Sequence, residues 1–301
     1  REVKRRLQAI ELDTVLESGY LQPFLEAKPF SLFSSVGVTE RPDTICAKIS
    51  EGRIAVLVDG TPFALVVPYL FSEHFQSLDD YANRPYFATL IRLIKYISFL
   101  ISILLPGLYV GLGEFNPEIF PPAILYKIFD AENATPFPLM MEALIIHFIY
   151  EIMREAGLRL PRPVGHAVSI VGALVIGESA VSAGLIGAPM VMIVAITAIS
   201  SFVVPSLYNP VAVLRFLFIF VGGFAGVYGV VLLGMVILID LCSLNTFGIP
   251  YMSPISPFDF GAMRDTFVRL SWKVLGKKTV KVQNLHGTDE TDRFQNGEED
   301  E

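Results

Sequence analysis

The sequence predicts an α-helical polytopic membrane protein with a small cytoplasmic α/β module at its N-terminal end. About half of the 301 residues are hydrophobic (52%), and only 18% are charged. The apolar residues are concentrated between residues 91 and 244, whereas the flanking regions have the composition of water-soluble protein. This segregation is typical of a membrane domain with soluble flanks.

We therefore expect three parts. Residues 1–85 form the cytoplasmic α/β module, which is the C-terminal part of a larger N-terminal domain. Residues 86–258 form a membrane domain of about four to five hydrophobic segments. Residues 259–301 form a cytoplasmic tail that is acidic and disordered at its end, because its seven closing acidic residues lie in sequence without apolar periodicity.

The N-terminal module shows helical and hairpin patterns. Apolar residues at helical spacing predict a helix over residues 2–24, and the turn at residues 40–43 opens a short helix that runs through Ile49. Two β-rich runs surround Asp59-Gly60, which is a strong signal for a tight hairpin turn. The module contains no phosphate loop, nucleophile elbow or metal-ligand spacing, so we expect no catalytic residue, no cofactor, no metal and no enzyme activity.

Residues 91–110 are long enough to cross a bilayer core of about 30 Å. Arg84, Arg92 and Lys95 lie near the start of this segment, and acidic residues follow it, so the positive-inside rule places the N-terminus in the cytoplasm. Pro106 interrupts the helix and predicts a kink.

Residues 139–153 form a shorter segment with ionisable side chains. His147, Glu151 and Glu155 recur every four residues and therefore share one helix face, and Glu142 lies earlier in the same segment. The segment is either an amphipathic helix at the membrane interface, which we favour, or a partial insertion whose polar face meets water or protein.

Residues 164–186 are rich in glycine, alanine and serine, which allow helices to approach closely in lipid. Glu178 lies deep in this segment, and His166 lies near its start. A carboxylate at that depth is unfavourable unless it meets a cavity or a partner. Two interpretations remain open from spacing alone: a tightly packed helix with Glu178 hydrogen-bonded to a neighbour, or a helix that lines a pore and contacts ions.

Residues 189–204 form another apolar segment, which we expect to pack antiparallel to the preceding one. Residues 211–244 form an apolar run interrupted only by Arg215 and Asp240. As one helix this run would measure about 50 Å, so it must tilt, project from the bilayer or break near Gly222-Gly223.

Five blocks of the sequence resemble the A subunits of the GerA family of spore germinant receptors. They are FSLFSSVGVTERPD (30–43), IAVLVDGTPFALVVP (54–68), REAGLRLPRP (154–163), VSIVGALVIGESAVSAG (168–184) and LCSLNTFGIPYMSPISPF (241–258). The resemblance runs over nearly the whole chain, and a SpoVAF-type paralogue with the same architecture fits these blocks as well.

The resemblance implies a multi-pass protein of the inner membrane of bacterial endospores. Its partners would be further copies of itself in a homo-oligomeric ring (a pentamer), a transporter-like B subunit and a lipoprotein C subunit. The implied function is a nutrient-gated channel for monovalent cations that triggers germination, with lipid but no nucleic acid as a further partner. On this basis the candidate pore and gate residues are Val171, Val175, Ile176, Glu178, Ser179 and Val181.

Three other functions remain as alternatives. A secondary transporter would use Glu178, His166 and Arg215, although the chain has no obvious inverted repeat. A membrane enzyme could hold a metal on the Glu142/His147/Glu151 face. A non-conducting scaffold for the other receptor subunits would need none of these side chains.

Overall fold

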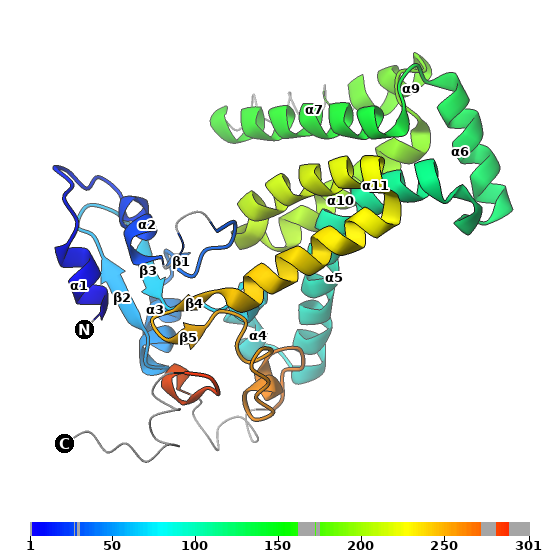
Figure 1. The fold of residues 1–301 in the computed structure, drawn as a ribbon. Coiled ribbons are helices and arrows are strands. Elements are labelled where there is room, and N and C mark those ends of the chain that lie inside the picture. Colours follow the sequence, from blue (N-terminus) through cyan, green and yellow to red (C-terminus); the bar gives the residue numbers. More distant parts are fainter. Residues whose placement is uncertain are drawn as a thin grey trace, which may run out of the picture. The chain divides into compact units, whose positions relative to one another are not determined.

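The computed structural model of the protein describes residues 2–26, 28, 31–161, 172, 175–271 and 281–288, and most of them are helical (Figure 1). The chain divides into two compact units. Unit 1 contains residues 1–95 together with residues 237–301, and unit 2 contains residues 96–236. Each unit therefore has its own core and is described separately.

Unit 1 is built around a three-stranded antiparallel sheet of order β1-β3-β2. The strands are β1 (Gly37–Thr39), β2 (Ile54–Leu57) and β3 (Ala64–Val67). Every residue of the central strand β3 is buried. Gly60 adopts a φ of 84° in the turn between β2 and β3, which confirms the predicted Asp-Gly hairpin.

The helices of unit 1 agree only in part with the expected ones. Helix α3 (Pro42–Ser50) confirms the short helix predicted after the turn at residues 40–43. The long helix predicted over residues 2–24 is wrong, because α1 (Glu2–Gln8) ends early and only η1 (Ser18–Leu21) and α2 (Gln22–Leu25) follow. The apolar side chains of this region still pack into one cluster with the sheet. Their spacing therefore identified residues that face the core, but it did not show that the backbone is one continuous helix.

The end of the chain completes unit 1. Beyond residue 243 lie β4 (Asn245–Thr246), β5 (Ile249–Pro250), η6 (Ala262–Asp265) and η7 (Val282–Asn284). Phe247 packs against the cluster that contains β3, and the Thr246 hydroxyl donates a hydrogen bond of 2.8 Å to Ser35. Leu70 shares a second apolar cluster with Ile249 and Leu285. Segments from both ends of the chain therefore contribute to both apolar clusters of unit 1.

A charged cluster joins the first turns of α5 (Pro85–Phe115) to the rest of unit 1. Arg92 is fully buried there; its Nε donates to Asp80 of α4 (Asp79–Ala82) at 3.1 Å, and its Nη1 donates to Asp265 at 2.8 Å. Lys95 lies 3.6 Å from the Asp80 carboxylate. Two of the three cations near the start of the first predicted span, Arg92 and Lys95, are thus bound by carboxylates of unit 1.

Unit 2 consists of helices. After α5 come η3 (Pro117–Ile119), α6 (Pro122–Ala134), α7 (Leu139–Arg159), α10 (Ala188–Val203), η5 (Pro205–Leu207) and α11 (Tyr208–Ser243). Among the residues that the structure describes, two helices are long and apolar enough to cross a membrane: Pro85–Phe115 and Pro205–Ser243. The pair α6 and α7, which bends by 78°, would be a third. Helix α10 is apolar but shorter, with 16 residues.

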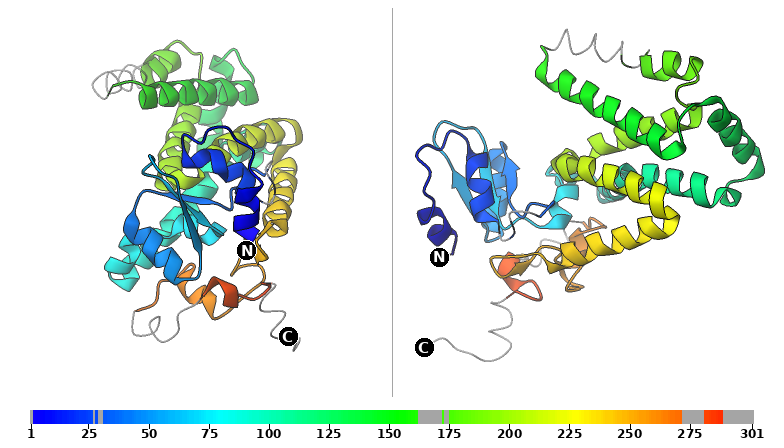
Figure 2. Two further views of the ribbon diagram at one scale, coloured as in Figure 1. Left: turned by 90° about the vertical axis from the view of Figure 1, so that its left-hand side faces the viewer. Right: turned by 45° about the horizontal axis from the view of Figure 1, so that its top comes forward.

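Glycines bring α5 and α11 close together. A Cβ on Gly107 would lie 2.5 Å from the carbonyl oxygen of Phe218, and a Cβ on Gly111 would lie 3.0 Å from the backbone of Gly226. Gly226 has φ 61° and ψ −156°, a conformation that is essentially restricted to glycine. The ribbon of α11 changes direction sharply inside unit 2 (Figures 1 and 2). Of the three expected possibilities for this long apolar run (tilt, projection from the bilayer or a break near Gly222-Gly223), the structure shows a break, and it lies at Gly226.

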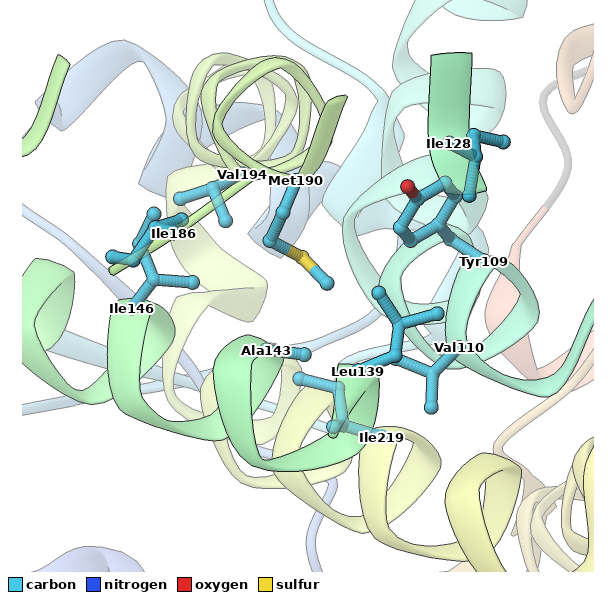
Figure 3. Packing of buried hydrophobic residues seen from close by; sticks show 10 residues of the cluster. All are labelled: Tyr109, Val110, Ile128, Leu139, Ala143, Ile146, Ile186, Met190, Val194 and Ile219. Carbon is cyan, nitrogen blue, oxygen red and sulfur yellow. The ribbon is translucent and has the colours of Figure 1, made fainter. Parts of the chain in front are cut away.

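The core of unit 2 lies between α5, α6, α7, α10 and α11. Figure 3 shows its ten buried side chains, with Ile146 of α7 beside Ile186 and with Met190 of α10 extending into the cluster. Residue Ile219 of α11 and Tyr109 of α5 complete opposite parts of this cluster. Helix α7 therefore packs through its apolar residues against the segment that ends at Gly187.

Candidate functional site

The predicted pore segment, residues 164–186, is described from its second half onward. η4 (Val175–Ser179) is a π-helical turn, and α9 (Ala180–Ser182) follows it directly. Gly184 then takes a φ of 67°, and Gly187 is the N-cap residue of α10. π-Helical turns are rare and occur frequently at functional sites, because one extra residue per turn displaces side chains from their regular helical positions.

The six candidate pore residues are distributed over this segment. Val171 lies outside the described residues. Val175 and Ile176 form the first turn of η4, but only their backbone is described. Glu178 and Ser179 are exposed in the chain, and Val181 is half-buried in α9. The carboxylate of Glu178 is thus presented on the surface of an apolar unit, next to the small residues Gly177 and Ser179.

Helix α7 precedes this segment and buries two ionisable side chains among apolar ones. Its buried face contains the ionisable residues Glu142 (2% exposed) and His147 (0% exposed), whereas Phe148 (60%) and Ile152 (54%) are exposed. A helix at the membrane interface presents its polar face to water. Glu142 and His147 thus meet protein, as in the second interpretation of residues 139–153, whereas the Glu155 side chain of the same helix is 49% exposed.

Glu142 fixes the far end of the candidate pore segment. Its Oε1 accepts a hydrogen bond of 2.6 Å from the backbone N–H of Gly187. This N–H belongs to the free N-terminus of α10, where a carboxylate is favoured by the unpaired donors and the helix dipole. A Cβ on Gly187 would lie 3.3 Å from Ala131 and 3.4 Å from Glu142, so glycine allows this close approach.

Glu151 lies nearer the C-terminal end of α7 and binds α11. Its Oε1 accepts a hydrogen bond of 3.2 Å from Nη1 of Arg215, and its Oε2 accepts one of 2.6 Å from the hydroxyl of Tyr208. Arg215 is fully buried, and its Nε also donates to the backbone carbonyl of Ser102 in α5 at 3.1 Å. Arg154 lies over the Tyr208 ring at 3.3 Å from its centroid.

Two features of the sequence are consistent with this ion pair. Arg215 is an isolated charge in an apolar run, and Glu151 belongs to the ionisable stripe of the neighbouring segment. Charged side chains inside apolar segments pair with one another, so two such residues on different segments are candidates for one pair. The sequence did not show which helices are neighbours.

The alternative sites receive less support from the geometry. The three side chains considered as metal ligands have different partners: Glu142 binds Gly187, Glu151 binds Arg215, and His147 Nδ1 lies 2.9 Å from the carbonyl oxygen of Ala143. Within the described parts of the chain, no group of three potential ligands lies close enough together to hold a metal ion. Of the residues considered for a transporter, Arg215 is bound to Glu151, and His166 lies outside the described residues.

Unit 1 contains a separate polar centre at Glu73 of η2 (Phe71–Phe75). This buried carboxylate lies 2.6 Å from Nη2 of Arg53 and accepts the backbone N–H of Leu70 at 2.8 Å, and Lys48 of α3 also donates to it. Burial alone would raise the pKa of Glu73, but the positive charges of Arg53 and Lys48 outweigh burial and hold that pKa below its usual value.

A cavity of about 220 Å³ lies beside Glu73. Its lining includes Arg41, Lys48, Glu51, Tyr69 and Tyr81. The two cations and the carboxylates of Glu51 and Glu73 balance in charge, and Lys48 already donates to Glu51 and Glu73. The contact between Lys48 and Glu73 links α3 to η2.

Comparison with known proteins places these features in a family context. Residues 1–280 match the family model described as Bacillus/Clostridium GerA spore germination protein. The chain is 45% identical over 284 residues to spore germination protein KA of Bacillus subtilis (strain 168), a match that covers 94% of this chain and 52% of that protein. It is 39% identical over 283 residues to spore germination protein B1 of the same strain, covering 93% and 59%.

A third relative is the uncharacterized membrane protein YfkQ of Bacillus subtilis (strain 168), with 40% identity over 279 residues, 92% of this chain and 54% of that protein. The chain thus spans little more than half of the length of these relatives. No solved structure matches the chain.

Proposed function

The chain belongs to the GerA family of spore germination proteins, and we propose that it is a germinant-receptor subunit that forms an oligomeric, nutrient-gated cation channel. A role in germination is supported by relatives that are named spore germination proteins and are 31–45% identical to this chain. The channel, its oligomeric state and its ion selectivity are our own extension of that role.

The observation that carries the proposal is the position of Glu178. This carboxylate is exposed on a π-helical turn of a helical unit whose neighbouring helices are long and apolar enough to span a membrane. An ionised carboxylate is unfavourable against lipid, so in a membrane this surface must face water or another subunit. A ring of subunits around an aqueous path meets both conditions.

In such a ring Glu178 attracts cations, and Ser179 offers a hydroxyl to a partly hydrated ion. Val171, Val175, Ile176 and Val181 would supply the apolar constriction. A narrow apolar ring closes a pore by excluding water, without a plug. Several Glu178 carboxylates close together would favour bound cations or protonation of some of them.

The proposed location is the inner membrane of the endospore, with the N-terminal module in the cytoplasm. Residues 1–95 and 237–301 form one compact unit, which supports placing both ends of the membrane region on the same side. An even number of crossings then separates Lys95 from Ile237. The proposed partners are further copies of this chain, a transporter-like B subunit and a lipoprotein C subunit.

Planar-bilayer recording of the purified chain tests the channel. The reference is compared with Glu178→Gln and Val175→Ala, and with Glu155→Gln as a control on an exposed carboxylate of α7. We expect cation-selective unitary currents, lower cation preference for Glu178→Gln, more frequent opening for Val175→Ala and no change for the control.

Silence from well-folded oligomers of the reference contradicts the channel and favours a non-conducting scaffold. Slow, saturable exchange in place of unitary currents indicates a secondary transporter.

A further inference from the structure

The ion pair between Arg215 and Glu151 is the point at which three helices of unit 2 meet. Arg215 of α11 is 0% exposed and Glu151 of α7 is 19% exposed, and the guanidinium also donates to the α5 carbonyl of Ser102. Tyr208 donates to the second carboxylate oxygen. The pair therefore holds α7 against both α5 and α11.

Such a pair is better suited to positioning than to stability. Desolvating two charges offsets most of their mutual attraction, and buried pairs can often be replaced by apolar residues of similar volume without loss of stability. Removing one partner alone is different, because it leaves a buried charge without compensation. The specific contribution of Arg215 and Glu151 is thus the placement of α7.

Helix α7 contacts the C-terminal end of the candidate pore segment. Its Glu142 binds the N–H of Gly187, where the segment ends. Ile146 of the same helix lies beside Ile186 in the core (Figure 3). A displacement of α7 relative to α5 and α11 therefore displaces the segment that carries Glu178.

We propose that the Arg215–Glu151 pair is a latch that positions α7, and with it the candidate pore segment, and that its release favours the open gate. The gating part rests on the proposed channel, whereas the positioning of α7 does not. Arg215 and Glu151 are positioning residues in this scheme, because they act through α7 and Glu142 and do not contact the ion path themselves.

The test uses the full chain in lipid nanodiscs and planar bilayers, with the double variant Glu151→Gln/Arg215→Met. This variant removes both charges of the pair, although Arg154, which lies 3.3 Å from the Glu151 carboxylate, loses that partner. Thermal stability is therefore expected to fall less in the double variant than in Glu151→Gln alone, which leaves the buried Arg215 without a counter-charge. The matched control is Glu155→Gln/Arg159→Met, which removes an exposed ion pair of 2.7 Å from the same helix. Glu151→Asp is a second test variant that keeps the charge but shortens its reach.

The first readout is amide hydrogen exchange, which reports local opening. In the double variant we expect exchange about tenfold faster over residues 139–159 and 180–191, and unchanged exchange in α5 and α11. Glu151→Asp should show a smaller increase in the same residues, and the control none. The second readout is open probability, which should rise in the double variant and in Glu151→Asp but not in the control.

The two readouts separate the latch from the channel. Faster exchange without current from any protein, the reference included, retains the positioning role and contradicts the channel and its gating. Unchanged exchange in both Glu151→Asp and a stable double variant overturns the latch, whatever the currents show.

Discussion

Arg92 in the first turns of α5 donates a hydrogen bond of 2.8 Å to the carboxylate of Asp265, which lies 173 positions later in the chain. The guanidinium is completely buried, and Asp80 is its second carboxylate partner. This contact ties the start of an apolar helix to the C-terminal segment of unit 1.

Asp265→Asn should lower the free energy of unfolding of unit 1 by about 1–2 kcal/mol, because Arg92 then retains only Asp80 as a charged partner. The effect stays below that of a fully buried pair, since the Asp265 side chain is 29% exposed. Asp79→Asn is the control: its carboxylate is 71% exposed and 3.7 Å from Arg41, so a change below about 0.5 kcal/mol is expected. Equal effects of the two variants in thermal unfolding would contradict this account.

Glu73→Gln should be the most destabilising carboxylate substitution in the centre around Glu73. It leaves Arg53, whose side chain is 4% exposed, without its buried counter-charge, which costs about 3 kcal/mol or more. Glu51→Gln is a matched control because Glu51 contacts the same two cations but is 38% exposed, so a loss below about 1 kcal/mol is expected. Denaturant unfolding measures the loss in free energy of unfolding for both variants. Equal losses would show that water reaches Glu73 and would contradict the prediction.

Gly222→Ala should destabilise unit 2 by about 1–3 kcal/mol, because the new methyl group would clash with the backbone of Gly107 in α5. Gly234→Ala lies in the same helix with open space around its Cβ position. There alanine should be neutral or stabilising by up to about 1 kcal/mol, since glycine is the weaker helix former. Opposite signs in thermal unfolding are the expected result, and a stabilising Gly222→Ala would refute the close α5–α11 contact.

Mild acidification should lower the free energy of unfolding of unit 1 through His74, at a pH above the range in which Glu73 contributes. Burial lowers the pKa of His74 to about 4, although Glu73 nearby opposes this shift. As the pH falls below about 6.5, His74 is therefore protonated in the unfolded state but stays neutral in the folded state. The free energy of unfolding of unit 1 decreases by about 1–2 kcal/mol between pH 7 and pH 5 as a result. Glu73, whose pKa is lowered, contributes only below about pH 4.5.

Hydrogen exchange of the β3 amides at pH 7 and pH 5, corrected for the intrinsic pH dependence of exchange, measures this loss. His74→Gln should flatten the pH dependence, and His286→Gln should keep it. A steep dependence that survives in His74→Gln would assign the effect to another group.

Local signals in the sequence were sufficient for elements that short segments determine. The Asp59-Gly60 turn and the helix after Arg41 were predicted because turn chemistry acts over a few residues. Strand β1 was not predicted, since its three residues become a strand only by pairing with β3. Helix α1 was predicted too long for a related reason: apolar spacing identifies residues that face a core, but it does not determine where a backbone leaves the helix.

The candidate site shows the same division. Glu178 and the small residues around it were recognisable from the sequence, but the π-helical turn on which Glu178 lies was not. A break near Gly222-Gly223 was one of three possibilities for the long run of α11. The break lies at Gly226, because Gly222 remains helical where it packs on Gly107. The Arg215–Glu151 pair depends on which helices are neighbours, and that information is absent from the spacing within either helix.

Unit 1 is built from residues near both ends of the chain, and this has a consequence for its biosynthesis. A ribosome delivers the three strands of the sheet early, but Phe247, which packs against their core, is translated only after residues 96–236. That interval is about 7–30 s at ~5–20 residues per second. During it the nascent module has an unfinished apolar surface, so a chain that stalls or terminates inside unit 2 leaves a species that chaperones and proteases recognise. The core of unit 1 is thus finished only after the residues that follow α11 have been translated.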